Sequence, residues 1–570
     1  MAGVKLRKIK KSKLNTDALK YFKEKKLLFA AWGCENKYFS IIEDWIPPFK
    51  RFFEEVIVFD PQANWYRYGK EYVNEKLLSM ISEKKPEFVL LYLLNDVFYI
   101  DTVRKIKEIS PETKIINFFG DDDAQYDSLS IYTVLFSDFN LVAQSKFIKD
   151  YIKAGVKNVF FTTGLGLEFS RTERVSKKYD VTFIGTPRGK YRSEPIKYLM
   201  DHGVNIKLFG FGWNDYPEFK EIYGGPLGKK EMVDVVKQSK INLSLTKDHS
   251  GIPHFKGRVC EMGSYKEFLL VEKSPAFSEL FKEGKEIVSF SDYEDLLKKV
   301  NYYLKNEPAR EKIAEATYDK ILNNYHFGVE LNNILNEVYK QRNTYPKYLP
   351  KIDKKIEKIT SLDFTLSPAK IKNKLKNADY VYFSNGKVKF YESKNYLQLY
   401  SLILNKKPIS VCDYYVHSKR LGNYLVSKMY PKIHSLPDRD DLTPMMNINQ
   451  LMVEKDYFFN NLIKFKKLMS GEKINLLNLE NSTFISIPLL EIDDSQIDFN
   501  EVNDNNFRNE ILWNFAPLVY QNKLFFNKYL YNFILESLFL RKFFLLKYLK
   551  KNLSNKVKWK TYQILSEQGI

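Results

Sequence analysis

Short apolar runs recur between residues 27 and 162, and the segments between them are long enough for helices. The first run, Leu27–Cys34, reaches a glycine turn near its end. Segments such as 101–109 and 145–154 have helical length. This alternation predicts a parallel sheet covered by helices on both faces, with ligands at the carboxyl ends of its strands. The other predicted strands are Val56–Phe59, Phe88–Tyr92, Lys114–Phe119, Phe139–Val142 and Val159–Thr162.

A second series follows a polar, aperiodic segment at residues 167–179, which we interpret as a linker. From Tyr293 to Tyr339 the apolar residues recur at helical spacing. The pattern therefore predicts two α/β lobes, residues 1–170 and residues 178–340. The strands predicted in the second lobe are Asp180–Gly185, Val204–Trp213, Ile241–Leu245 and Phe268–Glu272.

A boundary is expected at residues 341–355, which contain two prolines. Beyond it, residues 345–570 form an accessory region of unknown role. A strand at Ala378–Gly386, a helix at Asn395–Leu404 and a strand at Pro408–Cys412 would complete one β-α-β unit. After Ser418 the pattern favours a mainly helical, aromatic structure.

The composition is that of a folded protein, because 44% of its 570 residues are hydrophobic and 15% are aromatic. The three cysteines are far apart and form no CxxC pair. Their spacing argues against a disulfide framework or a zinc site and fits a reducing cytoplasm. We find no run of about 18 uncharged apolar residues and no secretory signal, so a cytoplasmic location is expected.

The formal net charge of +20 suggests an acidic partner: a nucleotide diphosphate, nucleic acid or an anionic membrane. Residues 538–560 carry eight Lys and Arg and no acid. Such a segment could lie on the inner face of a membrane, or pack against a partner or the other lobes. The lysines are dispersed and we recognise no nucleic-acid motif, so nucleic-acid binding is the alternative rather than the expectation.

The most informative stretch for chemistry runs from Ser250 to Asp292. Lys256 precedes a short predicted helix on which Arg258 and Glu261, three residues apart, share one face. A cation can meet the phosphates of a nucleotide diphosphate, and a carboxylate can accept hydrogen bonds from ribose hydroxyls. A surface salt bridge is the alternative interpretation.

This stretch resembles the nucleotide-sugar site of GT-B glycosyltransferases, in particular the CgeB-like (spore maturation) group of the group 1 glycosyltransferases. In that group an Arg, two residues and a Glu precede a small-residue turn, a hydrophobic strand and a segment that corresponds here to Glu279–Leu296. The resemblance covers roughly residues 25–340. It implies two Rossmann-like lobes facing a cleft, with the donor on the second lobe and the acceptor on the first.

The resemblance also implies a function. A sugar would pass from a nucleotide sugar, by default a UDP-sugar and perhaps UDP-N-acetylglucosamine, to a surface glycan or a protein such as flagellin. No cofactor beyond the donor is expected. A catalytically inactive GT-B scaffold is a further alternative.

The loop after the predicted strand Asp180–Gly185 holds Arg188, Lys190 and Arg192. Its backbone amides and cations would make a phosphate cradle, or else it is a solvated basic loop. Trp213 could stack near the base of the nucleotide, although a place in the core is the main expectation.

A run of three acids follows a strand in the first lobe, at Asp121, Asp122 and Asp123. Asp121 and Asp123 match the DxD pattern that holds a metal in GT-A enzymes, but the GT-B resemblance implies that no metal is needed. Residues 1–170 contain no histidine. A base from this lobe would therefore be a carboxylate, and the resemblance implies that Asp122 or a neighbour contacts the acceptor. A retaining mechanism without a protein base is the alternative.

The chain departs from the family-4 retaining enzymes, which carry Glu-x7-Glu. If Glu261 is the second Glu, the first falls at Pro253, and the adjacent His254 is a candidate replacement. This departure puts family-4 retaining chemistry in doubt and leaves nucleotide binding intact.

Overall fold

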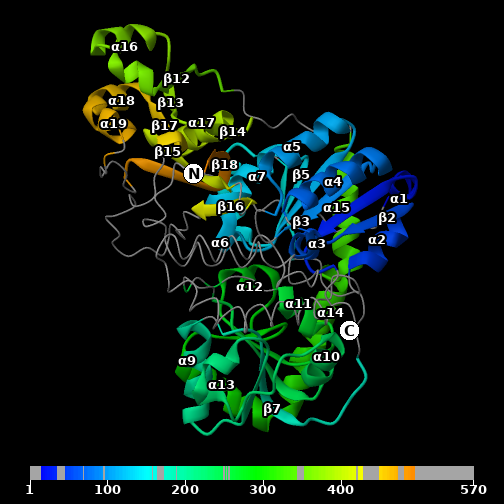
Figure 1. Ribbon diagram of the computed structural model, residues 1–570. Coiled ribbons are helices and arrows are strands. Elements are labelled where there is room, and N and C mark those ends of the chain that lie inside the picture. The colour runs from blue at the N-terminus through cyan, green and yellow to red at the C-terminus, as the bar shows by residue number, and fades with distance from the viewer. Residues whose placement is uncertain are drawn as a thin grey trace, which may run out of the picture.

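The structure is a computed structural model, in which two lobes and a third sheet are recognisable (Figure 1). The residues that it describes are 15–34, 45–68, 70–93, 97–156, 158–163, 172–187, 189–247, 251, 253, 257–342, 352–418, 422–427, 448–470, 472 and 480–493.

The first lobe contains a six-stranded parallel sheet in the order β2-β1-β3-β4-β5-β6. All six predicted strands are confirmed. Side chains alternate between two cores because successive strand residues face opposite sides of the sheet: Leu28 and Ala30 of β1 face one core, and Leu27 and Phe29 face the other. The strands are β1 (Lys26–Ala31), β2 (Glu55–Phe59), β3 (Phe88–Tyr92), β4 (Lys114–Phe119), β5 (Phe139–Val142) and β6 (Val159–Phe161).

Helices cover both faces of this sheet. Apolar residues at helical spacing, such as Val73, Leu77 and Ile81, bury one stripe of each helix against the strands. The helical elements are α1 (Thr16–Lys23), α2 (Ile46–Phe52), α3 (Pro61–Tyr68), α4 (Lys70–Lys84), α5 (Ile100–Ile109), α6 (Asp122–Gln125), η2 (Tyr126–Ser130), α7 (Ile131–Thr133), η3 (Val134–Phe136), η4 (Ser145–Phe147) and α8 (Ile148–Lys153).

The second lobe contains a five-stranded parallel sheet in the order β11-β10-β9-β7-β8. Its strands are β7 (Tyr179–Ile184), β8 (Ile206–Phe209), β9 (Ser239–Ser244), β10 (Leu269–Glu272) and β11 (Val288–Phe290). From β7 the chain passes to β8 on one side and then crosses to β9 on the other, which places a topological switch point between β7 and β9. The helical elements are α9 (Lys190–Asp201), η5 (Trp213–Asp215), η6 (Pro217–Phe219), α10 (Lys229–Lys237), α11 (Gly257–Gly263), α12 (Pro275–Leu280), α13 (Tyr293–Lys305) and α14 (Glu307–Asn324).

Helix α15 (Phe327–Lys340) leaves the second lobe and returns to the first. Its residues Leu331 and Leu335 are buried in the same cluster as Phe22 of α1 and Phe29 of β1. The Asn336 side chain also accepts a hydrogen bond of 3.1 Å from the backbone of residue 15. Two doubly wound lobes braced by a returning helix are the GT-B arrangement that the resemblance implied.

A third, seven-stranded mixed sheet has the order β12-β13-β17-β15-β18-β14, with β16 paired to β15. The strand, helix and strand of the predicted β-α-β unit are present as β13, α17 and β15, but β14 lies between β13 and α17 in the chain, and β17 lies between the two strands in the sheet. Its described elements are β12 (Ile356–Thr360), η7 (Ser361–Thr365), α16 (Pro368–Lys374), β13 (Tyr380–Ser384), β14 (Val388–Phe390), α17 (Lys394–Asn405), β15 (Ile409–Ser418), β16 (Gly422–Ser427), η8 (Ile448–Gln450), β17 (Leu451–Glu454), α18 (Lys455–Asn460), α19 (Leu462–Met469) and β18 (Ser482–Asp493).

The mainly helical structure expected after Ser418 is not what the described residues form there. Strands β16, β17 and β18 occur beside two short helices, and β18 runs for 12 residues. Buried Ile485, Ile487 and Leu489 alternate along β18, which is the spacing of a strand. The basic segment 538–560 lies outside the described residues.

The third sheet packs on the first lobe. Asp101 of α5 accepts hydrogen bonds from the backbone N–H groups of Glu392 (2.9 Å) and Ser393 (3.1 Å), just before α17. The Tyr400 hydroxyl of α17 donates to the Ala154 carbonyl at 2.9 Å. Ile487 belongs to the same buried cluster as the first-lobe core. The third sheet and α17 are therefore joined to the first lobe by polar and apolar contacts.

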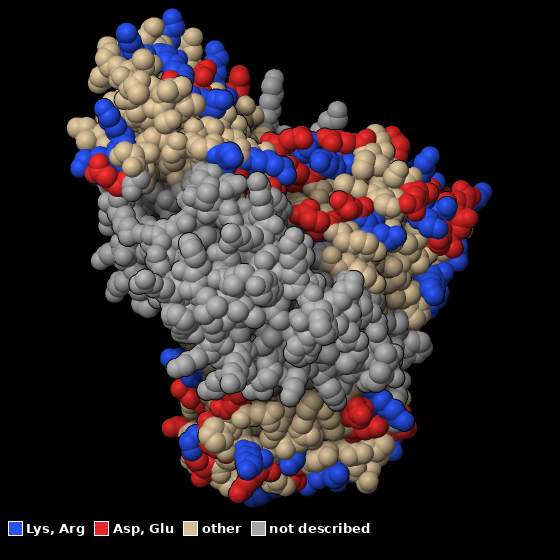
Figure 2. Space-filling view, viewed as in Figure 1, with Lys and Arg blue, Asp and Glu red and all other residues tan. Residues whose placement is uncertain are grey.

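The surface of the described residues mixes both signs of charge. On the face drawn in Figure 2, Lys and Arg side chains are interspersed with Asp and Glu over both lobes. The positive net charge is therefore not gathered into one basic stripe on the described part of this face. Within the described ranges, no helix has the length and apolar character needed to cross a membrane.

Candidate functional site

A cavity of about 370 Å³ opens at the switch point of the second lobe. It lies at the carboxyl ends of β7 and β9, where open α/β sheets bind ligands, and its volume is in the range of small-molecule sites. The charged residues among those that line it are Arg192, Lys229, Arg258 and Glu261. Three cations and one carboxylate make this described lining net positive, which favours an anionic ligand.

Close backbone packing forms one wall of the cavity. Gly185 follows β7 and Gly210 follows β8, and both line the cavity. Gly210 has a φ of +121°, and a Cβ there would lie 2.5 Å from the carbonyl oxygen of Gly185, so only glycine fits. The same carbonyl accepts a 2.7 Å hydrogen bond from the Trp213 indole. Trp213 is buried and belongs to the core of this lobe, the role that was mainly expected.

Helix α11 presents the predicted Arg258 and Glu261 to the cavity, while Val259 and Cys260 are buried beneath it. The Arg258 guanidinium donates to the carbonyl of Ile184 at 3.3 Å, which holds it at the end of β7. The sequence spacing thus placed both residues on the face of α11 that lines the cavity.

Lys229 is a lining residue that sequence reasoning missed. It begins α10, directly after Gly228, and its ammonium lies 3.0 Å from a carboxylate oxygen of Glu261. Both side chains are largely buried, with 15% and 17% exposed. A glycine-rich segment before an amphipathic helix, residues 224–228, was the available signal. The sequence alone does not connect Lys229 with the carboxylate of Glu261, which lies 32 residues further along the chain.

Only part of the predicted phosphate loop lines the cavity. Arg192 is buried, and its guanidinium donates to the carbonyl of Thr186 at 2.7 Å. Lys190 is exposed, does not line the cavity, and places its ammonium 5.5 Å from the centre of the Tyr191 ring. The predicted residues Arg188, His254 and Lys256 lie outside the described residues.

The start of α11 lies against the end of the first lobe, because a Cβ on Gly257 would come within 3.7 Å of the Thr163 carbonyl. At this seam, Glu330 of α15 accepts hydrogen bonds from Thr162 (2.9 Å) and Thr163 (3.4 Å). Burial raises the pKa of the Glu330 carboxyl to about 7, although the two threonine hydrogen bonds lower it. A buried carboxyl thus sits where both lobes and the cavity helix meet.

The three acids after β4 have different surroundings. Asp122 is buried, and both of its carboxylate oxygens accept from the Tyr151 hydroxyl at 3.1 Å. Asp121 is half-buried, and the side chain of Asp123 is not among those that the structure describes. Asp122 is therefore engaged inside the lobe, and Asp121 is the partly exposed carboxylate. No group of three or more His, Cys, Asp or Glu within the described ranges could hold a metal.

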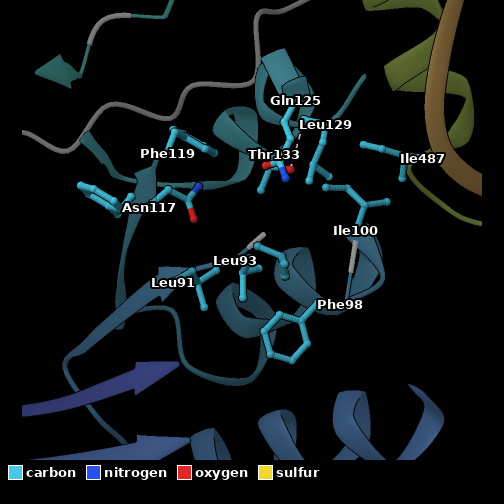
Figure 3. A pocket seen from close by; sticks show the side chains of 12 residues that line it. Leu91, Leu93, Phe98, Ile100, Asn117, Phe119, Gln125, Leu129, Thr133 and Ile487 are labelled. Atoms are coloured by element: carbon cyan, nitrogen blue, oxygen red, sulfur yellow. Dashed lines mark hydrogen bonds between the residues drawn. The ribbon is translucent and has the colours of Figure 1, made fainter. Parts of the chain in front are cut away.

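A much smaller cavity, about 30 Å³, lies between the first lobe and the third sheet (Figure 3). Leu91, Phe98 and Leu129 line it together with Ile487 of β18 and the amide of Asn117. This volume holds one or two waters and no sugar. It is a gap in the packing at the joint between the two regions.

Residues 192–336 match a family model described as glycosyl transferase-like. The match covers 145 of the 570 residues. The matched segment contains the cavity residues Arg192, Lys229, Arg258 and Glu261, so the site lies within the part of the chain that the family describes. The match does not distinguish the CgeB-like group from the rest.

Several solved glycosyltransferase structures are similar to this chain at low identity. The UDP-glucose complex of Anabaena HepE shares 13% identity, covering 56% of this chain and 100% of that one, with a TM-score of 0.42. A glycosyltransferase from Rickettsia africae shares 12%, covering 57% and 100%, with a TM-score of 0.38. Sucrose-phosphate synthase from Thermosynechococcus elongatus shares 6%, covering 56% and 99%, with a TM-score of 0.40. A search of curated proteins finds no match.

Proposed function

We propose that the protein transfers a sugar from a UDP-linked donor to a glycan or protein acceptor. The observation that carries the proposal is the net positive cavity at the switch point of the second lobe, with Arg258 and Glu261 side by side on α11. UDP-N-acetylglucosamine remains the default donor and flagellin an example of a protein acceptor.

In this proposal the second lobe binds the donor and stabilises the leaving group. Arg258 and Arg192, together with backbone amides after β7, meet the diphosphate, whose negative charge grows as the glycosidic bond breaks. Glu261 accepts hydrogen bonds from the ribose hydroxyls, and Lys229 holds its carboxylate in place. Holding donor and acceptor in one geometry supplies the rest of the rate enhancement.

The first lobe contributes the acceptor side, with Asp121 as the carboxylate that contacts the acceptor hydroxyl. An inverting route uses this carboxylate as a base, whereas a retaining route does without one. The two routes predict different behaviour for Asp121→Asn: loss of the chemical step in the first, and weakened acceptor binding alone in the second. The anomeric configuration of the product, determined by NMR, separates them independently.

A thermal-shift panel of nucleotide sugars tests the proposal most directly, because a ligand that binds only the folded state raises the melting temperature. UDP and at least one UDP-sugar should stabilise the wild type, and Glu261→Ala should reduce the shift at the same ligand concentration. Stabilisation by no UDP compound would exclude the donor assignment.

A catalytically inactive scaffold is the second candidate, and Pro253 at the place of the first Glu favours it. Such a protein would bind UDP yet neither transfer nor hydrolyse the sugar. Product formation from a UDP-sugar excludes it. On the described part of the face in Figure 2, Lys and Arg are mixed with Asp and Glu and form no basic stripe of the kind that favours nucleic-acid binding. A contact through residues 538–560, with a membrane or a partner, remains a prediction.

A further inference from the structure

The first lobe has a switch point of its own. From β1 the chain passes to β2 on one side and later to β3 on the other, which places the switch point between β1 and β3, and open α/β sheets bind ligands at the carboxyl ends of the strands there. Trp32 follows β1, Tyr92 ends β3, and Asp121 follows the next strand, β4. The Trp32 backbone N–H donates to the Tyr92 carbonyl at 3.2 Å. Three neighbouring strands therefore bring these residues to one edge of the sheet.

Aromatic packing fixes the two rings at this edge. The Trp45 ring stacks on Tyr92 with centroids 5.1 Å apart and an angle of 11° between the planes. Phe118 meets Tyr92 edge-on at 4.6 Å, and Trp32 meets it edge-on at 6.1 Å. Trp45 is buried, whereas Trp32 and Tyr92 are half-buried. The inner rings thus hold two partly exposed rings in a fixed arrangement.

Polar groups stand beside the rings. Burial raises the pKa of the Tyr92 hydroxyl, and the charge of Asp121 raises it further, so this hydroxyl remains a hydrogen-bond donor at neutral pH. The half-buried Asp121 carboxylate is an acceptor. Gly120 lies beside the hydroxyl, because a Cβ there would be in van der Waals contact with the Tyr92 hydroxyl oxygen, at 3.4 Å.

This combination fits the chemistry of a pyranose ring. A sugar has a face of C–H groups, which packs against aromatic rings, and a rim of hydroxyls, which needs both donors and acceptors. The only charge among Trp32, Tyr92 and Asp121 is negative, which disfavours a phosphate-bearing ligand at this place. The second lobe, with its three lining cations, offers the opposite environment.

We propose that Trp32, Tyr92 and Asp121 form a saccharide subsite that binds the pyranose ring of the acceptor. The inference rests on the proposed function, because it takes the first lobe as the acceptor side. It selects a glycan over an unglycosylated protein segment as the acceptor. Trp32 packs against the ring, and Asp121 accepts a hydrogen bond from a ring hydroxyl.

Saturation-transfer NMR tests the subsite on the full-length chain. The probes are the methyl glycosides of glucose, galactose and N-acetylglucosamine, each in the presence of saturating UDP. The wild type, Trp32→Leu, Asp121→Asn and a control, Tyr302→Leu, are compared. Tyr302 is a good control because its ring is 53% exposed on the second lobe.

At least one glycoside should bind the wild type and the control equally, and both first-lobe variants should weaken it by about tenfold or more. UDP affinity, measured by calorimetry, should be the same in all four proteins. Binding of no glycoside to the wild type, or unchanged binding in both variants, would overturn the subsite. A wild type that binds a glycoside but no UDP would instead contradict the proposed donor function. Asp121→Asn keeps the shape of the side chain, so the test survives if Trp32→Leu fails to fold.

Discussion

Both parallel sheets reverse their strand order at a switch point, yet they present different chemistry there. The second lobe gathers Arg192, Lys229 and Arg258 around a cavity, whereas the first lobe places Trp32 and Tyr92 beside a carboxylate. The backbone plan supplies the position of a site in each lobe, and the side chains decide its ligand. One edge favours an anion, and the other favours a neutral ligand with an apolar face.

The largest expected effect is on donor binding, when the carboxylate of the second-lobe cavity is removed. Glu261→Ala should weaken UDP binding by about 2 to 4 kcal/mol, because the ribose hydroxyls lose charge-assisted hydrogen bonds. Glu261→Gln keeps one acceptor oxygen and should be milder. Calorimetric titration of UDP measures both. Unchanged UDP affinity in a folded Glu261→Ala variant would mean that the second-lobe cavity is not the donor site, and the proposed difference in ligand between the two lobes would be wrong.

The second prediction concerns Glu330, at the seam between the lobes. The pKa of its carboxyl is about 7, above the ordinary value of 4.5. Between pH 4.5 and 7, therefore, the carboxyl is protonated in the folded protein and ionised in the unfolded chain. Stability is therefore lost as the pH rises from 4.5 through 7, by up to roughly 3 kcal/mol. Glu330→Gln should be more stable than the wild type at about pH 8 and nearly equal to it at about pH 5.

Urea denaturation at the two pH values measures this difference. Glu337→Gln is the matched control on the same helix, because Glu337 forms a surface ion pair with Lys340 at 2.7 Å. A difference between Glu330→Gln and the wild type that does not change with pH would show that Glu330 is not a buried proton-binding group.

A smaller effect is expected at Lys229. Variants of this residue distinguish a lysine that positions the Glu261 carboxylate from one that contacts the donor itself. Lys229→Met leaves the largely buried Glu261 without the ammonium at 3.0 Å, and UDP affinity should fall by about tenfold. Because the two residues are in contact, the double variant with Glu261→Ala should lose less than the sum of the single losses. Lys230→Met, at the exposed neighbouring position, should bind UDP normally. Tighter UDP binding by Lys229→Met would mean that the lysine competes with the donor.

The smallest expected effect is that of metal removal. The cations of the cavity can neutralise the diphosphate, so transferase activity should persist in an excess of chelator. A radiometric or coupled assay with and without EDTA measures this. The contrary result would be a wild type that is inactive without manganese or magnesium, together with loss of activity in Asp121→Asn. The acidic run would then be a metal site, and the assignment of the first lobe would be wrong.

Local pattern was sufficient for the strands of the first sheet and for one part of the site. Buried parallel strands have continuous apolar runs, so all six strands of the first sheet were predictable. Arg258 and Glu261 were predictable as a pair because helical spacing alone places them on one face. The β-rich part of the third sheet was missed, because buried residues on both faces of β18, such as Leu489 and Leu490, interrupt a simple alternation of apolar and polar positions.

Only the tertiary structure decided which distant residues meet. Lys229 pairs with Glu261 across 32 residues, and Asp122 is buried against Tyr151, 29 residues away, while Asp121 beside it stays half-exposed. Propensity and periodicity describe a residue and its neighbours within a few turns. The partner and burial of a polar side chain depend instead on how whole sheets and helices pack, so the charge of one switch point and the aromatic surface of the other emerged only with the fold.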